Sequence, residues 1–302
     1  MSQSPPDILF YYAPSDTILH GLREGKLPWY SPASLDGVTE LNHQSQLLFD
    51  QKQVLSSATK YACSLIFGPS EPSGETPVIA AIRRWRSSGR FQQYEEAEVV
   101  LAELCSKLID QRFAELDTMM SQWFEACAGF RMLSLYERAD NFLLWHRRAD
   151  CLRGLCLGLR VSKDAQLRGA KALRYENQRP EITTLKEQIA TIFYNKKVQP
   201  LKNMPEKFSN KAPAFMRDKE WRCYRQEAGD KHQAPADWIT QVPFNPEAIA
   251  SIGLGPAMPA AEKEAVLREL EEQLPNTKVT DYQFARSSFE LQGHTIERKS
   301  EA

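Results

Sequence analysis

Apolar positions along this chain occur in two patterns, as short continuous runs and at every third or fourth residue. The two patterns alternate irregularly along the chain. Ile8 to Tyr12 and Met132 to Tyr136 are short apolar and aromatic runs, and such runs predict strands. Gly154 to Val161 is apolar almost throughout, which is typical of a strand buried on both faces. Within it, Gly158 would let another backbone segment approach closely. Because strands and helices interleave without a regular βα repeat, we expect an α+β fold with one mixed or antiparallel sheet.

A second pattern predicts a helical insertion over residues 41–130. Between Ala97 and Cys127, apolar residues recur every three or four positions, as in one long amphipathic helix or a helical hairpin. Residues 68–77, rich in Pro, Gly, Ser and Glu, predict a loop inside this insertion. We therefore expect residues 1–302 to form a single α+β domain interrupted by helices.

Further elements are expected in the last third of the chain. Apolar runs predict strands at Cys223 to Gln226, Trp238 to Val242 and Val279 to Phe284. Between the last two, Ala260 to Leu274 has helical periodicity and begins with an acidic turn.

Composition excludes several classes of protein. The 302 residues contain 38 Lys and Arg against 39 Asp and Glu, so overall charge does not indicate binding to nucleic acid or an anionic membrane. No apolar run has the length of a membrane span, and the first residues lack the pattern of a secretory signal. We expect no membrane association, and a cytoplasmic location in the producing cell or in a target cell that receives the protein.

Cysteine and histidine spacing gives no metal motif. The six cysteines are scattered without a C-x-x-C pair, and the five histidines contain no H-x-x-x-H pair. We therefore expect buried reduced thiols, no disulfide framework and no metal.

The charged stretch from Arg217 to Arg222 stands out just before a predicted strand. In an extended segment Asp218 and Glu220 would share one face, and neighbouring carboxylates can form sites for proton transfer. From the spacing alone, a solvated, charge-compensated strand edge is the preferred interpretation. The stretch therefore indicates a site only if other motifs converge on it.

The order of motifs resembles the bacterial domain family numbered 2971 among the domains of unknown function. Family patterns have counterparts throughout the chain: L-Y-K-Y-R at Leu9 to Ala13, W-F-S-x-P at Trp29 to Ala33, S-L-S with D-N-x-L-M-W-S-H-Y-A-D from Ser134 to Asp150, G-x-C-I-G-F at Gly154 to Leu159, W-x-Y-E-x-E-W-R at Phe215 to Arg222, and I-x-x-I-x-L-G, which we interpret as a helix pattern, at Ile249 to Gly255.

Departures from the family pattern fall on polar positions. The first strand ends in Ala13 where the family has Arg, and S-H-Y is replaced by His146, Arg147 and Arg148. The first Glu of E-x-E is Asp218. A retained scaffold with altered polar groups suggests a changed substrate or lost catalysis.

This order also looks like the layout of ADP-ribosyltransferases, enzymes that consume NAD. The resemblance implies Glu220 as the catalytic carboxylate, Asp218 as the residue that orients the acceptor, and Ser134 as support for the ribose or the strand. Tyr11 or Tyr12 would stack on nicotinamide. Arg147 or Arg148 would bind phosphate, although two adjacent helical residues should not both face one pocket.

Two functions follow from these resemblances. One is an NAD-dependent transferase or glycohydrolase, used as a bacterial toxin, an effector or a phage-defence component that modifies a protein or nucleic acid. The other is a catalytically inactive interaction module, such as an immunity protein, an antitoxin or a sensor with a cognate protein partner. For the second, the insertion and its basic cluster from Arg83 to Arg86 would form the binding surface.

Overall fold

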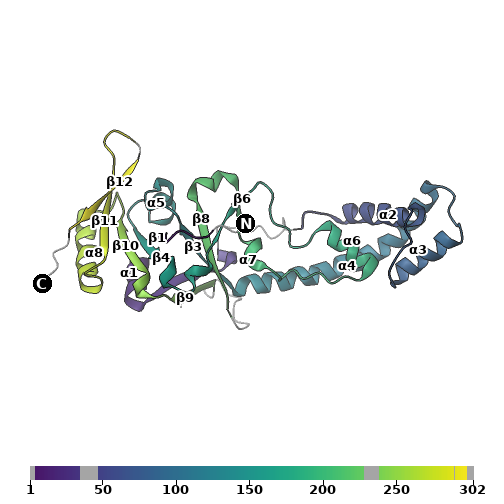
Figure 1. The fold of residues 1–302 in the computed structure, drawn as a ribbon, viewed down its shortest axis with the longest axis horizontal. Coiled ribbons are helices and arrows are strands. Elements are labelled where there is room, and N and C mark those ends of the chain that lie inside the picture. Colours follow the sequence, from purple (N-terminus) through teal and green to yellow (C-terminus); the bar gives the residue numbers. More distant parts are fainter. Residues whose placement is uncertain (1–3, 35–46, 228–237, 289, 298–302) are drawn as a thin grey trace. The chain divides into compact units, whose positions relative to one another are not determined.

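The computed structural model describes residues 4–34, 47–227, 238–288 and 290–297 (Figure 1). It divides into two compact units. The first comprises residues 1–41, 127–178 and 209–302, and the second comprises residues 42–126 and 179–208. The helical second unit therefore takes up most of the expected insertion, together with a later segment that the sequence pattern did not assign to it.

The first unit is built on a mixed sheet, which confirms the α+β fold class. In the described residues ten strands join, and only β10 and β11 pair in parallel. The order across the sheet is β12 (Leu291–Ile296), β11 (Lys278–Phe284), β10 (Ile249–Leu254), β4 (Leu155–Arg160), β1 (Ile8–Ala13), β3 (Phe130–Tyr136), β2 (Lys26–Tyr30) and β9 (Ile239–Pro243), while β8 (Glu220–Gln226) adds to β3 and β5 (Lys171–Ala172) adds to β8.

Shorter elements complete the first unit. The helices are α1 (Ser15–Glu24), α5 (Phe142–Arg148) and α8 (Ala260–Gln273). A small parallel sheet joins β6 (Arg174–Tyr175) to β7 (Asn210–Lys211), and a 3-10 helix, Pro213–Asp218, leads into β8. These short pieces place charged side chains beside the central strands.

The core of this unit follows the alternation of the central strands. Leu133 and Leu135 of β3 and Trp221 and Cys223 of β8 are buried in one cluster of apolar side chains. The predicted close approach at Gly158 is confirmed, because a Cβ there would lie 2.5 Å from the Ser251 hydroxyl. The approaching group is a side chain rather than a backbone.

One predicted element has the wrong type. The segment Ile249 to Gly255, interpreted as a helix pattern, instead contains strand β10, which pairs with β4 on one side and β11 on the other. Its apolar residues repeat at a spacing that a short helix and a doubly paired strand share, so periodicity did not separate the two.

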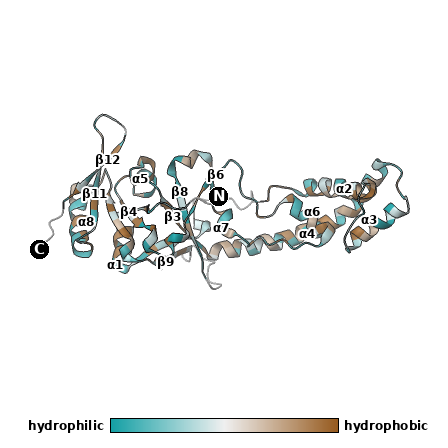
Figure 2. Ribbon diagram, in the orientation of Figure 1, coloured by the Kyte–Doolittle hydropathy of each residue, from teal (hydrophilic) through white to brown (hydrophobic). Residues whose placement is uncertain are grey.

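The second unit is helical in its described residues. It contains α2 (Gln51–Phe67), α3 (Pro77–Ser87), most of α4 (Tyr94–Gly129), α6 (Leu185–Tyr194) and α7 (Met204–Lys207). Apolar residues alternate with hydrophilic ones along α4 (Figure 2). The buried residues of α4 include Leu101, Cys105 and Ile109, which pack in a separate core with Ile79 and Phe193. The long amphipathic helix is thus one continuous helix rather than a hairpin.

The basic cluster of α3 has a structural use that the sequence did not reveal. Arg83 donates to the carbonyl oxygens of Pro72 and Gly74, and Arg86 donates to those of Leu65 and Ser70. These arginines therefore hold the predicted loop at residues 68–77 against α3. In the described residues no helix is long and apolar enough to cross a membrane.

Candidate functional site

The central sheet opens beside the middle of β3. β1 contacts β3 at one pair, Phe10 and Tyr136, and β2 contacts it at one pair, Tyr30 and Met132. The other edge of β3 pairs with β8 along its whole length. If the β1–β3 ladder continued, Tyr12 would face Ser134, but in the described chain the two strands share no further pair. Ser134 therefore lies at an opening between two points of contact.

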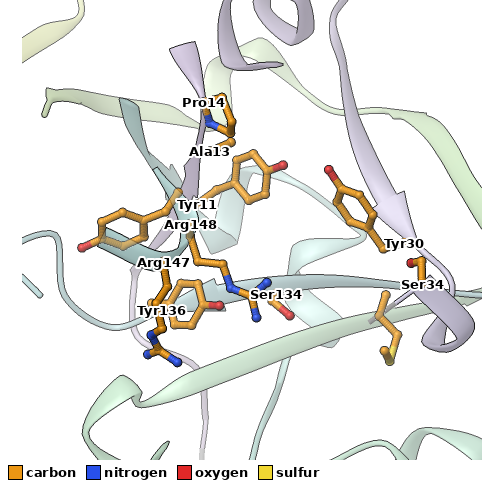
Figure 3. Close-up of a pocket in the computed structure, with 11 residues that line it drawn as sticks. Tyr11, Ala13, Pro14, Tyr30, Ser34, Ser134, Tyr136, Arg147 and Arg148 are labelled. Carbon is orange, nitrogen blue, oxygen red and sulfur yellow. The ribbon is translucent and has the colours of Figure 1, made fainter. Parts of the chain in front are cut away.

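A cavity of about 260 Å³ occupies this opening. Figure 3 shows side chains from β1, β2, β3 and α5 around it. The residues that line it are Tyr11, Tyr12, Ala13, Pro14, Tyr30, Ser34, Met132, Ser134, Tyr136, Arg147 and Arg148. Among the residues that the structure describes, the lining contains hydroxyl groups, aromatic rings and two cations, and no carboxylate.

Helix α5 carries both cations to the cavity. It begins at Asn141, whose side chain accepts hydrogen bonds from the backbone of Leu143 and Leu144, as expected for a cap. The expectation that only one of the two arginines would face a pocket is wrong, because Arg147 and Arg148 both line the cavity. They differ in their surroundings, however.

Arg148 extends among the cavity's hydroxyl groups (Figure 3). Its charge acts on the phenols of Tyr11 and Tyr136. Burial, a hydrogen bond to Tyr30 and the other phenols raise the pKa of Tyr11, and the charge of Arg148 opposes that rise. The phenols therefore stay protonated and can donate hydrogen bonds to a ligand.

Tyr12 is held more tightly than Tyr11. Its hydroxyl donates to the backbone carbonyl of Arg138 across 2.7 Å. Its ring meets the rings of Tyr136 and Trp145 edge to face, with centroids 5.8 and 5.2 Å away. Tyr12 thus forms a rigid aromatic wall of the cavity, whose hydroxyl group is already engaged.

Glu220 lies behind Ser134 and has no exposed side-chain surface. The Ser134 hydroxyl donates to Oε1 of Glu220 across 2.7 Å. Arg222 Nε donates to the same oxygen across 2.6 Å, and Lys211 Nζ donates to Oε2 across 2.8 Å. Burial raises the pKa of Glu220, but the charges and hydrogen bonds of Arg222 and Lys211 outweigh it, so the net pKa lies well below the ordinary value. Glu220 is therefore an ionised carboxylate held by two cations.

Asp218 does not continue the strand of Glu220, as the sequence spacing had suggested. It is the last residue of the 3-10 helix, and Lys219 between the two carboxylates adopts a left-handed conformation with φ of 49°. Asp218 is 3 % exposed and accepts a hydrogen bond from Arg147 across 2.6 Å. The two carboxylates are therefore held by different cations, Arg147 at Asp218 and Lys211 and Arg222 at Glu220, instead of sharing a proton.

Phe215 connects these two ion pairs. The Arg147 guanidinium lies 5.3 Å from the centre of its ring, and Lys211 Nζ lies 4.7 Å from it. A ring between two cations is a favourable arrangement, because the faces of aromatic rings carry partial negative charge. Phe215 thus contacts both a cation paired with Asp218 and a cation paired with Glu220.

The structure brings most of the predicted site residues together. Tyr11, Tyr12, Ser134, Arg147 and Arg148 line one cavity, whereas Glu220 and Asp218 each stand behind one of them. Sequence reasoning missed Lys211, Tyr30 and Tyr136. Arg222 could have been inferred, because it lies two residues after Glu220 and so on the same face of a strand. The described residues contain no cluster of His, Cys, Asp and Glu suited to a metal ion.

No protein-family model matches the chain, and searches of curated proteins and of solved structures return no match either. Inference about function therefore starts from the geometry of this cavity.

Proposed function

We propose that this chain is an ADP-ribosyltransferase-like protein of the 2971 domain family and that the cavity of the first unit binds NAD. The supporting observation is the opening between β1 and β3. It gathers Tyr11, Tyr12, Ser134 and Arg148 from three distant parts of the chain, with Glu220 one hydrogen bond away.

The chemistry of the lining suits a dinucleotide. Arg148 would bind a phosphate group, since a guanidinium offers several donors in a fixed plane. The ring of Tyr12 would pack against nicotinamide, and Tyr11 would donate from its phenol. The cavity volume lies just below the range of 300–1,000 Å³ typical of small-molecule sites, so we expect it to hold one end of NAD while the rest lies outside.

The proposed reaction breaks the bond between nicotinamide nitrogen and the ribose carbon. The bonding electron pair leaves with nicotinamide, and a nucleophile of a protein, a nucleic acid or water then bonds to that carbon and loses its proton to solvent. Positive charge develops on the ribose in the transition state, so a nearby carboxylate lowers the barrier. Glu220 would supply that charge from behind Ser134, and the proposed biological setting is a bacterial toxin, effector or defence protein.

A second candidate is an inactive module that binds a ligand without turnover. The observation in its favour is the engagement of both Glu220 oxygens by cations, with no side-chain surface at the cavity. Two positive charges partly cancel the field that would stabilise an oxocarbenium ion. Under this reading the module would work with a cognate protein partner.

Calorimetric titration with NAD and a measurement of nicotinamide release separate these candidates. Binding with release that falls on Glu220→Gln supports the transferase, whereas binding without release supports the module. Glu269→Gln is the matched control, because Glu269 forms an exposed ion pair with Arg23 elsewhere in the unit. If millimolar NAD neither binds nor is cleaved, both NAD-based proposals are wrong.

A further inference from the structure

The hydrogen-bonding direction of Ser134 is set by its surroundings rather than by the ligand. A serine hydroxyl has one hydrogen to donate, and an ionised carboxylate can only accept. Across the 2.7 Å contact the hydrogen of Ser134 must therefore point to Oε1 of Glu220. Ser134 then presents to the cavity only the lone pairs of its oxygen.

Two cations keep this arrangement in place. Arg222 and Lys211 contact different oxygens of Glu220, and their own side chains are only 2 % and 3 % exposed. A buried carboxylate held on both oxygens by charged donors has little freedom to rotate or to take up a proton. The carboxylate thus acts as a fixed acceptor behind Ser134.

Helix α5 offers hydrogen-bond donors to the cavity, whereas Ser134 offers an acceptor. Arg148 also lines the cavity, and a guanidinium donates hydrogen bonds and accepts none. The α5 wall of the cavity can therefore donate to an anionic acceptor of a ligand, while the Ser134 wall can accept from a donor. Sulfate carries no hydrogen at neutral pH, so it satisfies the first wall and not the second.

We propose that Ser134 is a specificity-determining residue, positioned by Glu220, Lys211 and Arg222, which selects anionic ligands that also carry a hydroxyl or amide donor, as sugar phosphates do. This inference rests on the proposed function in so far as the ribose phosphate of NAD belongs to that class. The inference goes beyond the proposed function, because it assigns the binding selectivity to Ser134 and a positioning role to Lys211.

The ligand comparison that tests this proposal uses ribose 5-phosphate and sulfate on the full chain. We expect ribose 5-phosphate to bind more tightly to the unaltered protein. Ser134→Ala should weaken ribose 5-phosphate about three- to tenfold, the effect of one neutral hydrogen bond, and leave sulfate affinity within about twofold. Equal weakening of both ligands, or failure of ribose 5-phosphate to bind, overturns the proposal.

A double variant that leaves the net charge unchanged distinguishes a positioning role of Lys211 from a role in folding. Lys211→Met with Glu220→Gln removes one charge of each sign and keeps an amide oxygen that accepts from Ser134 and Arg222. We expect it to retain the preference for ribose 5-phosphate, whereas Lys211→Met alone should reduce that preference. Thermal unfolding checks that each variant is folded. If the double variant loses the preference while folded, the assigned role of Lys211 is wrong.

The outcomes for NAD and for the sugar phosphate are distinguishable. If NAD fails to bind but ribose 5-phosphate binds with the dependence on Ser134, the proposed function fails and this inference stands. If NAD binds and is cleaved but Ser134→Ala has no selective effect, the inference fails alone.

Discussion

Ser134 on β3 donates a hydrogen bond to Glu220 on β8 across 2.7 Å, although 86 residues separate them in the sequence. The contact joins the lining of the cavity to a buried carboxylate that two cations neutralise. The properties of the site therefore depend on a charge cluster that no ligand would touch directly. Substitutions in this cluster should therefore change the free energy of unfolding and the affinity for a ligand to different extents.

Removing the carboxylate should destabilise the fold strongly. In Glu220→Ala the buried side chains of Lys211 and Arg222 lose their shared counter-ion. We expect a loss of about 3–5 kcal/mol in the free energy of unfolding, measured by urea denaturation, because removing one member of a buried ion pair is strongly destabilising. The control Glu269→Ala, whose ion pair with Arg23 is partly exposed, should change it by about 1 kcal/mol or less. A similar small loss for Glu220→Ala would show that the cluster is solvated.

The same carboxylate gives the fold a defined acid dependence. Because its pKa in the folded state lies below the ordinary value of 4.5, its stabilising effect is complete above that value and declines as the pH falls below it. The difference in unfolding free energy between the unaltered protein and Glu220→Gln should therefore shrink between pH 7 and pH 3. A difference that stays constant over this range contradicts the assignment of an ionised Glu220.

In the ion pair of Asp218 and Arg147, replacing Arg147 should destabilise the protein more than replacing Asp218. Asp218 is 3 % exposed, while the Arg147 side chain is 31 % exposed and can reach water. Arg147→Met leaves a buried carboxylate without its cation and should cost about 3 kcal/mol. Asp218→Asn keeps an acceptor for Arg147 and should cost about 1 kcal/mol. Urea unfolding of both variants checks this order, and a reversed order would contradict the burial of Asp218.

Arg148 should contribute to ligand binding more than to stability. If it binds phosphate, Arg148→Gln should weaken NAD about tenfold to a hundredfold, the range for a hydrogen bond to a charged group. Arg153→Gln is the matched control, because Arg153 pairs with Asp150 at the surface just beyond α5. Calorimetric titration measures both. Equal affinities for the two variants would place the phosphate elsewhere.

Gly158 should tolerate no side chain without a compensating change. A Cβ at this position would lie 2.5 Å from Ser251 Oγ and 3.1 Å from Phe10 Cε1. We expect Gly158→Ala to destabilise the protein by about 1–3 kcal/mol through overpacking. Adding Ser251→Gly should recover part of that loss, and urea unfolding of the single and double variants tests whether the clash is the cause.

Local patterns in the sequence determined most of the elements. The aromatic run at Ile8 to Tyr12, the apolar run at Met132 to Tyr136 and the apolar run after Gly154 each form the strand expected of them. These signals suffice because the pattern of a strand depends on neighbours a few residues away. The spacing of Asp218 and Glu220 misled, since the left-handed Lys219 between them ends the 3-10 helix and the strand begins only at Glu220.

Only the tertiary structure decided how the site works. The sequence indicated Tyr12, Ser134, Arg148 and Glu220 as separate candidates, and the separation of β1 from β3 gathers the first three around one cavity. One partner of Glu220 could not be foreseen, because Lys211 reaches it from a two-residue strand in a different sheet. Ion pairing depends on distance in space, which local periodicity does not encode, so the sequence identified the candidate residues and the fold decided which of them face a ligand.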